Sequence, residues 1–443
     1  MKKSAQLKAV TAADSYVIAG AQVVDPSTGV DGIHDVWVEE GKIGGVLKAG
    51  AGAELVKSSK AKFSVDAKGL LLAPGLVDIH THLREPGQEY KETIATGTEA
   101  AVAGGFTTIL CMANTSPVND NPYVTKYILS LVEKNARCRV FPVGALSKGL
   151  KGEELAEIGK MKEAGVVAIS DDGMPVMNSY LMRKALDYCR GFDLPVLVHA
   201  EDAYLVGKGV MHEGFHSCCL GLRGIPAESE EIMVARDVAL ARLTKGRVHF
   251  CHISARQSLP HLRRAREEGL AVTAEVTPHH LTFCDEDVST YDSNYKMAPP
   301  LRAKEDVEAM RKALSDGTID CIATDHAPHA PRDKSALFEF AANGVVGMET
   351  AWSVGLSLVD SGALTLSRLI EVLSTKPARI MGLEGGTLKV GAPADFFVSD
   401  LGAVQQLEVG HLHSRSKNSP FLGKSLRGRV IVTMVGGACR WMS

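Results

Sequence analysis

Two hydrophobic patterns divide the chain. In its middle, continuous apolar runs alternate with helix-compatible segments; the runs read GLVDIH, TTILCM, CRVFPVGA, GVVAIS, LPVLVHA, RVHFCHI, LAVTAEV and DCIATD. Runs without polar alternation are typical of strands buried on both faces of a parallel sheet. Eight such strands with intervening helices over about 250 residues predict an α/β fold, a TIM (β/α)8 barrel. A doubly wound open sheet is the alternative, but no GxGxxG follows an early strand.

The two ends of the chain have a different texture. Short β-type runs bounded by Gly, Asp and Pro occur near the N-terminus (YVIAGAQVVD, KFSVDA) and near the C-terminus (ADFFVSDL, RVIVTMVGGACRW). We expect both ends to pair into one small composite β-sandwich domain. The predicted organisation is residues 1–73 and 379–443 for this domain and residues 74–378 for the barrel.

Composition narrows the function classes. Of 443 residues 23% are charged, and the formal net charge of -3 gives no electrostatic case for nucleic acid or for an anionic membrane. No apolar stretch approaches the roughly 18 residues of a transmembrane helix, and Lys8 and Asp14 interrupt any signal-peptide-like apolar region. Nine cysteines without a CxxC motif predict reduced thiols, and we expect a cytoplasmic protein.

Polar side chains collect where the predicted strands end, which is where a barrel builds its active site. The first strand ends in His-x-His, a spacing that points both rings the same way. Further strands end with histidine or aspartate; the candidates are His80, His82, Asp171, Asp172, His199, His252, Asp325, His326 and His329. Imidazoles and carboxylates that converge at a desolvated barrel mouth need a cation to organise them. Four histidines with two aspartates suit zinc or a similar first-row ion, in one or two sites.

The order of motifs along the chain points to a known family. The motifs are DIHTHLREPGQEYKET, MANTSPVND, ISDDGMPV, VHAEDAYL, GIPAESEEIMVARD, CHISARQS, AEVTPHHL, NYKMAPPLR and ATDHAPH. With them the sequence resembles the amidohydrolase superfamily and, within it, the class I dihydroorotases. The resemblance covers nearly the whole chain.

The resemblance implies metal ligands position by position. It implies a first ion at His80, His82 and Asp325, and a second, where present, at His199 and His252. Many relatives bridge the two ions with a carboxylated lysine, whereas class I members use an aspartate.

Asp172 matches this bridging aspartate, and Asp171 becomes a neighbour that orients the loop. Lys160 and Lys162 lie on the preceding helical segment, where neither could bridge. Because an aspartate is a shorter bridge than a carboxylated lysine, one ion or two remain open.

Substrate contacts are implied in the same way. Arg84 matches the family's carboxylate-binding arginine, since a guanidinium fork suits a carboxylate; a surface salt bridge is the alternative. The other substrate contacts that the resemblance implies are His82, Asn114, His329, Asn343 and Gly344. There are departures: Ala298 stands where relatives commonly have an asparagine, and Asn343–Gly344 replaces a usual Phe-Gly pair.

The activity that the resemblance implies is the reversible cyclisation of N-carbamoyl-L-aspartate to L-dihydroorotate, a zinc-dependent step of pyrimidine biosynthesis. Asp325 would be the catalytic residue that carries the proton between the attacking water and the ring nitrogen. Two alternatives remain: another cyclic amidase of hydantoinase or allantoinase type, and an inactive homologue that is a scaffold for aspartate transcarbamoylase. The resemblance also implies a small-molecule substrate, a homodimer, and an association of the active enzyme with aspartate transcarbamoylase.

Overall fold

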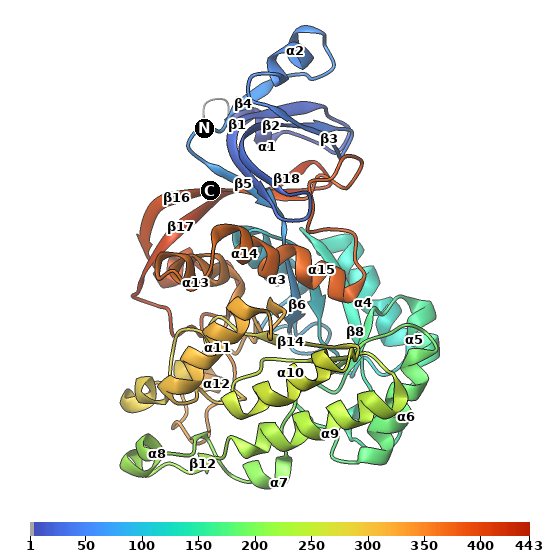
Figure 1. Cartoon of the computed structure of the whole chain (residues 1–443), viewed down its shortest axis with the longest axis vertical. Coiled ribbons are helices and arrows are strands. Elements are labelled where there is room, and N and C mark those ends of the chain that lie inside the picture. Colours follow the sequence, from blue (N-terminus) through green and yellow to red (C-terminus); the bar gives the residue numbers. More distant parts are fainter. Residues whose placement is uncertain (1–3) are drawn as a thin grey trace.

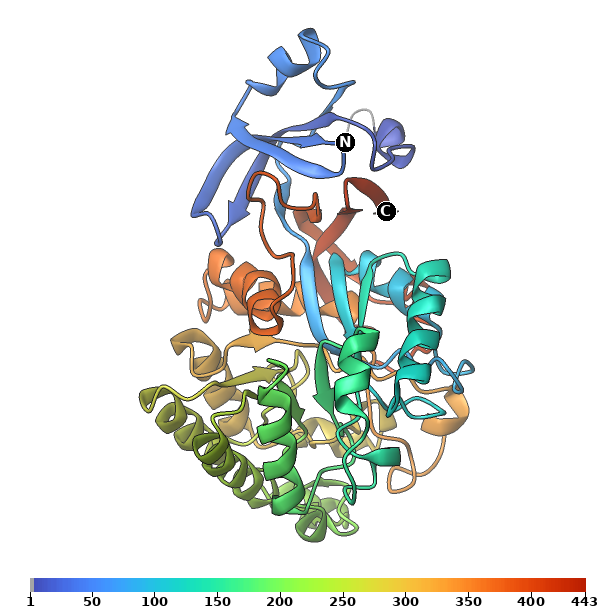
Figure 2. The ribbon, with the colours of Figure 1, turned by 90° about the vertical axis from the view of Figure 1, so that its right-hand side faces the viewer.

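The computed structural model describes residues 4–443; residues 1–3 of the predicted N-terminal segment lie outside the described part. The chain forms two parts that lie end to end (Figure 1). A sheet domain contains the N-terminal strands and the last strands of the chain, and below it lies a ring of strands surrounded by helices (Figure 2). The predicted α/β barrel with a composite sheet domain is therefore confirmed.

All eight predicted apolar runs form the parallel barrel strands. They are β6 (Leu76–Thr81), β7 (Phe106–Cys111), β8 (Arg139–Gly144), β9 (Ala168–Ser170), β10 (Val196–Val198), β13 (Val248–Phe250), β14 (Val272–Val276) and β15 (Cys321–Ile322). They pair in chain order from β6 to β15. The ring is closed just beyond β15, where Thr81 pairs in parallel with His326 and the His82 amide donates to the His326 carbonyl at 2.8 Å.

Helices cover the outside of the ring. The main ones are α3 (Ile94–Ala103), α4 (Pro122–Asn135), α5 (Ile158–Ala164), α6 (Ser179–Arg190), α9 (Glu228–Thr244), α10 (Leu259–Glu267), α11 (Lys304–Asp316) and α13 (Met348–Asp360). A large apolar cluster fills the layer between strands and helices, with Phe106, Phe250 and Trp352 fully buried. A smaller cluster that includes Val77, Leu110 and other strand residues is also buried. Burial on both faces explains why these strands read as continuous apolar runs.

The sheet domain joins both ends of the chain. Its strands are β1 (Tyr16–Asp25), β2 (Val30–Glu39), β3 (Lys42–Lys48), β4 (Ser64–Asp66), β5 (Leu71–Pro74), β16 (Phe396–Gln406), β17 (Ser425–Val435) and β18 (Ala438–Met442). The order is β18-β17-β16-β5-β1-β2-β3, and β4 pairs with β1. The β16–β5 pairing is the antiparallel seam between the two chain ends. The boundaries at 73/74 and 378/379 stay predictions.

Shorter elements fill the connections. They are α1 (Ser4–Lys8), α2 (Gly52–Lys57), α7 (Ala203–Val206), β11 (Met211–His212), α8 (Phe215–Leu220), β12 (Gly224–Ile225), α12 (Pro331–Lys334), α14 (Leu366–Ile370) and α15 (Lys376–Met381). All nine cysteines are free thiols, as predicted. Among the helices of residues 4–443, none has the length and apolar character to cross a membrane.

Candidate metal centre and active site

The predicted ligand side chains converge at the carboxyl end of the barrel. His80 lies in β6 and His82 directly follows it, while Asp172, His199 and His252 follow β9, β10 and β13 within two residues. Asp325 follows β15 and completes the group. All six side chains are buried. Residues that span most of the barrel sequence therefore meet at one point, as the ends of parallel strands in a closed ring must.

Asp172 lies at the centre of this group. Its Oδ1 is 3.4 Å from His80 Nε2, 3.7 Å from His199 Nδ1 and 3.5 Å from His252 Nε2. Its Oδ2 is 3.4 Å from His82 Nε2. One carboxylate thus faces all four histidines and directs its two oxygens to different members.

Asp325 approaches the same cluster from the β6 side. Its Oδ1 is 3.0 Å from His82 Nε2 and 3.5 Å from His80 Nε2. Potential ligand atoms of His80, His82 and Asp325 lie within 4.8 Å of one another, and so do those of His80, Asp172 and His252. His199 Nδ1 lies 2.9 Å from His252 Nε2 and adjoins the second set. Two sets of candidate metal ligands, which have His80 in common, therefore lie side by side at the mouth of the barrel.

Neighbouring groups fix which ring nitrogen of each histidine is available. His80 Nδ1 lies 2.6 Å from Glu275 Oε1, and His82 Nδ1 lies 2.9 Å from Asn114 Oδ1. These oxygens accept a hydrogen bond from Nδ1–H of each ring, so that in the neutral tautomer Nε2 of both rings has a lone pair directed into the cluster. Hydrogen bonds of this kind orient metal-binding histidines and raise their basicity.

His199 has the opposite arrangement. Its Nε2 lies 3.2 Å from Glu201 Oε2, so Nδ1 is the nitrogen that faces Asp172 and His252. Glu201 thereby sets the tautomer of His199, as Glu275 does for His80.

The electrostatics of the cluster are those of a site that requires a cation. Burial would lower the pKa of His80, but the carboxylates of Asp172 and Glu275 raise it well above its usual value. The pKa of His199 is likewise raised, to about 10, against the effect of burial. Burial would raise the pKa of Asp325, but His80 and His82 hold it below its usual range. Without a metal ion, protons must supply the positive charge that the buried carboxylates need.

Two buried atoms show that the donor set fits a metal ion. Among the described residues, His80 Nε2 and Asp172 Oδ1 have no hydrogen-bond partner although both are shielded from solvent. Such atoms are costly to bury unpaired. Imidazole nitrogens with carboxylate oxygens suit zinc and similar divalent ions, so the six residues fit the ion that the sequence predicts.

The cluster forms one wall of a cavity of about 260 Å³. The lining includes the predicted substrate contacts His82, Arg84, Asn114, His329, Asn343 and Gly344, and also Ala298 and Glu201. The structure thus brings all the predicted site residues together. Asn114 contacts both His82 and this cavity, and the methyl group of Ala298 offers no hydrogen bond there.

Arg84 is a buried cation without a carboxylate partner in residues 4–443. Its side chain is 8% exposed, its Nε donates to the Pro328 carbonyl at 3.3 Å, and one terminal nitrogen lies 3.5 Å from His329 Nε2. Burial and then Arg84 lower the pKa of His329 to about 2, so its ring is neutral. A guanidinium buried in this way is stabilised by an anion, and the surface salt bridge that was the alternative is excluded by its burial.

Strained backbone positions several of these groups. Arg84, His252 and Asp325 have φ values of 60°, 35° and 47°, in the left-handed region that side chains other than glycine rarely adopt. Such strain persists only where the surroundings impose it, and it occurs frequently at functional sites.

Asp171, next to Asp172, has a different role at the mouth of the barrel. Its Oδ1 accepts from the amides of Leu146 and Ser147, at 2.7 and 3.0 Å, and its Oδ2 accepts from the Ser147 hydroxyl. Asp171 therefore holds the loop after β8, as predicted, while Asp172 faces the cluster. Lys160 lies on α5 and pairs with Glu157 at the surface, away from the site.

Three further residues of the site were not predicted. Glu275 and Glu201 occur in the quoted motifs AEVTPHHL and VHAEDAYL, so their positions in the sequence could have drawn attention to them. Asn418 had no such signal, because it comes from the C-terminal segment. Its Oδ1 accepts from the His329 amide at 3.0 Å, and its amide group donates to the Ala327 and Gly344 carbonyls. It fixes the two loops that line the cavity opposite the cluster.

Comparison with known proteins agrees with this geometry. A family model described as Dihydro-orotase-like matches residues 69–258, and one described as Amidohydrolase family matches residues 223–440. The dihydroorotase of Anaeromyxobacter dehalogenans is 53% identical, with coverage of 96% of this chain and 97% of its own. That of Citrifermentans bemidjiense is 50% identical, covering 96% and 98%.

Solved structures support the fold. The L-hydantoinase from Arthrobacter aurescens superposes with a TM-score of 0.85 at 25% identity, covering 96% of this chain and 95% of its own. The dihydropyrimidinase from Brevibacillus agri gives a TM-score of 0.81 at 24% identity, covering 96% and 94%. The second likeness concerns the fold alone.

Proposed function

Because the chain belongs to the dihydroorotases of the amidohydrolase family, and is thus a cyclic amide hydrolase, we propose that it interconverts L-dihydroorotate and N-carbamoyl-L-aspartate. One observation carries this proposal: a buried guanidinium, Arg84, lines the same 260 Å³ cavity as the histidine–aspartate cluster. The cluster suits hydrolysis of an amide, and the unpaired cation suits a substrate that carries a carboxylate. The reaction belongs to pyrimidine biosynthesis.

The metal in this proposal is zinc, in one or two sites. His80, His82 and Asp325 would hold one ion; His199 and His252 would hold a second, with Asp172 between them. A divalent ion here supplies Lewis acidity, which activates water as a nucleophile near neutral pH and polarises a carbonyl.

Asp325 is the proton carrier. Its Oδ1 contacts His82, and the residue lines the cavity in which the ring amide would lie. His80 and His82 keep its pKa below the usual range, so the carboxylate is ready to accept a proton from the attacking water. It then delivers that proton to the ring nitrogen as the amide bond breaks, and the reverse transfers close the ring.

Arg84, Asn114 and His329 bind the carboxylate end of the substrate in this proposal. The neutral His329 ring lies beside Arg84 and can orient the guanidinium without repelling it. The backbone at Asn343 and Gly344 provides the remaining contacts, which do not depend on the side chain at 343. Ala298 gives up one neutral hydrogen bond, worth about 0.5–1.5 kcal/mol, and so weakens binding without removing the chemistry.

The decisive experiment measures metal content and turnover on the same preparation. Dihydroorotate, hydantoin and allantoin are offered in parallel, and we expect turnover of dihydroorotate alone to be efficient. Preference for hydantoin or allantoin would favour the other cyclic amidases. If the protein binds no metal and shows no turnover even after zinc is supplied, the result would favour the inactive scaffold.

The remaining expectations are also proposals. We place the protein in the cytoplasm as a homodimer that associates with aspartate transcarbamoylase, on the strength of the family resemblance. Sedimentation of the protein alone and with a transcarbamoylase partner tests both associations.

A further inference from the structure

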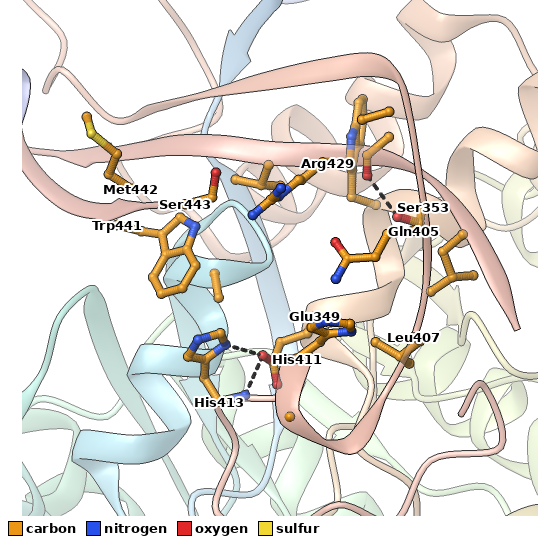
Figure 3. A pocket seen from close by; sticks show the side chains of 17 residues that line it. Glu349, Ser353, Gln405, Leu407, His411, His413, Arg429, Trp441, Met442 and Ser443 are labelled. Carbon is orange, nitrogen blue, oxygen red and sulfur yellow. Dashed lines mark hydrogen bonds and ion pairs between the residues drawn. The ribbon is translucent and has the colours of Figure 1, made fainter. Parts of the chain in front are cut away.

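A second cavity, larger than the active site, lies where the last strands of the chain meet α13. It measures about 410 Å³ and shares no lining residue with the cavity at the metal cluster. Glu349 and Ser353 of α13 form one side, and residues of β16, β17 and β18 and of the segment between β16 and β17, including His411 and His413, form the others. Figure 3 shows its polar and aromatic side chains, which include Arg429 and Trp441. Nothing in the proposed reaction uses this cavity.

Hydrogen-bond donors in the cavity are unpaired. Within residues 4–443, the Arg429 guanidinium and the Gln405 amide make no side-chain hydrogen bond or ion pair, and the shielded Trp441 Nε1 has no acceptor. Figure 3 shows Arg429 and Gln405 on the same side of the cavity, across from the imidazoles. Arg429 is exposed and Gln405 is half-buried, whereas Trp441 Nε1 is a shielded donor without an acceptor, which is costly. A ligand that offers an acceptor to Trp441 Nε1 would therefore be stabilised here.

The charge of the cavity favours an anion. Glu349 provides the one carboxylate side chain of the lining, and its oxygens already accept from the His413 amide at 2.6 Å, His413 Nδ1 at 2.9 Å and the Ser414 amide at 3.2 Å. The hydrogen bond to Glu349 raises the pKa of His413. Arg429, which is exposed at the rim, makes no ion pair within residues 4–443, and guanidinium groups pair well with phosphate and carboxylate.

The walls favour a planar ring. The Trp441 indole packs edge-on against the His413 ring, with centroids 4.5 Å apart and an interplanar angle of 75°. Leu407, Leu426 and Met442 add apolar surface. Aromatic faces of this kind stack on heterocycles, and the Gln405 amide can both donate to and accept from the edge of such a ring.

The cavity is connected to the active site through one short segment, residues 413–418. Its first residue, His413, lines the cavity. Ser414 Oγ donates to Glu92 Oε2, and the same oxygen lies 3.4 Å from His326 Nε2. The last residue, Asn418, holds His329 and Gly344 at the active-site cavity.

We propose that this cavity binds a planar heterocycle that carries a phosphate or carboxylate group, and that its occupancy changes substrate affinity through residues 413–418. Arg429 binds the anionic group, Trp441 supports the ring, and Gln405 contacts its edge. A ligand that moves His413 shifts the segment that also holds the active-site loops.

Binding is tested by calorimetry and tryptophan fluorescence on the full-length protein. Uridine 5′-monophosphate and nicotinate are the phosphate- and carboxylate-bearing probes; uridine and inorganic phosphate each supply only one half of the proposed ligand. We expect at least one complete probe to bind about tenfold or more tightly than either half. Failure of both complete probes to bind would overturn the proposal, and so would equal binding of inorganic phosphate alone, the mark of a nonspecific anion site.

Matched variants locate the site. We expect Arg429→Gln and Trp441→Ala to weaken binding about tenfold or more, whereas Arg440→Gln, on the same strand as Trp441 but outside the lining, keeps it. We expect Arg84→Met also to keep binding of the probe, because Arg84 lies in the active-site cavity and not in this one. Loss of binding in Arg84→Met would show that the probe binds at the active site. Melting curves confirm that each variant folds. Unchanged binding by Arg429→Gln would contradict the proposal, and dissociation of an oligomer by this substitution would identify the cavity as a contact with a second copy.

The coupling has its own readout. With a saturating probe we expect the KM for dihydroorotate to change at least twofold in the wild type and to stay constant in Arg429→Gln. Binding without any change in KM or kcat would overturn the coupling while it leaves the binding site in place. Because the binding measurements need no turnover, failure of the proposed dihydroorotase activity would not be mistaken for failure of this site.

Discussion

We propose that Arg84 is the residue that makes the active-site cavity favour an anion. Replacing it with methionine removes the charge and keeps most of the buried volume. Hydrogen bonds to a charged group contribute about 1.5–3 kcal/mol, so kcat/KM for dihydroorotate should fall roughly 10- to 150-fold. Dihydrouracil lacks the carboxylate and is the matched substrate, for which the variant should change little. An equal loss on both substrates would mean that Arg84 supports the structure of the loop and not the carboxylate.

In the proposed mechanism, Asp325 has a role in proton transfer that the other candidate metal ligands do not share. In Asp325→Asn the side chain keeps its shape but cannot accept the proton, and general base catalysis contributes about 10²- to 10⁴-fold. We therefore expect kcat to fall by at least about 100-fold in protein that still contains metal. Metal analysis of the same sample is essential, because the variant also loses a charged ligand. Normal turnover with metal bound would contradict the assignment.

Elements were easier to predict than the contacts between them. The eight barrel strands could be found because burial on both faces makes each one a continuous apolar run. The candidate metal ligands could be picked out as well, since His80, Asp172 and Asp325 stand at strand ends where a barrel collects its chemistry; their roles as ligands stay a prediction. Asn418 could not be found, because its role depends on a C-terminal segment folding back over the barrel. Which hydrogen bonds orient each histidine is likewise a property of the tertiary structure.

The segment that follows β16 provides a prediction about pH. His413 on this segment bonds to Glu349 on α13, and this hydrogen bond raises the pKa of His413 above its ordinary value. A pKa raised by folding stabilises the protein below the unfolded-state value near 6.5, and the stabilisation is lost as pH rises through the folded value. His413→Gln should therefore lower the Tm most at pH 5–6 and least at high pH.

The expected size of this effect is modest. The His413 side chain is about a third exposed, so the pair contributes up to about 1 kcal/mol. Differential scanning calorimetry of both proteins across pH 5–9 measures the difference. His261→Gln is the control, since its 3.5 Å contact with Glu231 is also partly exposed but belongs to the barrel helices. If the Tm difference between the wild type and His413→Gln grew as the pH rose, the predicted direction of the pH dependence would be wrong.

At the scale of the whole molecule, the histidine–aspartate cluster that we propose as a metal site joins residues from around the barrel. Its side chains lie at or just beyond the ends of β6, β9, β10, β13 and β15, and β6 and β15 are the two strands at which the ring closes. An ion held only by the folded ring stabilises it by mass action, by about 2.7–4.1 kcal/mol at 100 to 1,000 times its dissociation constant. Chelation should therefore lower the Tm, and zinc should restore it.

The protonation of the cluster determines how this stabilisation depends on pH. Metal and protons compete for the same nitrogens, and the pKa of His199 is raised to about 10. The rise in Tm produced by zinc should therefore shrink as pH falls from 9 to 6, and metal binding should release protons in calorimetry with buffers of different ionisation enthalpy. Since His252 lies within 3.5 Å of Asp172, His252→Asn should reduce the response. If neither the chelator nor zinc changed the Tm, the barrel would be stabilised by its apolar core and not by a bound ion.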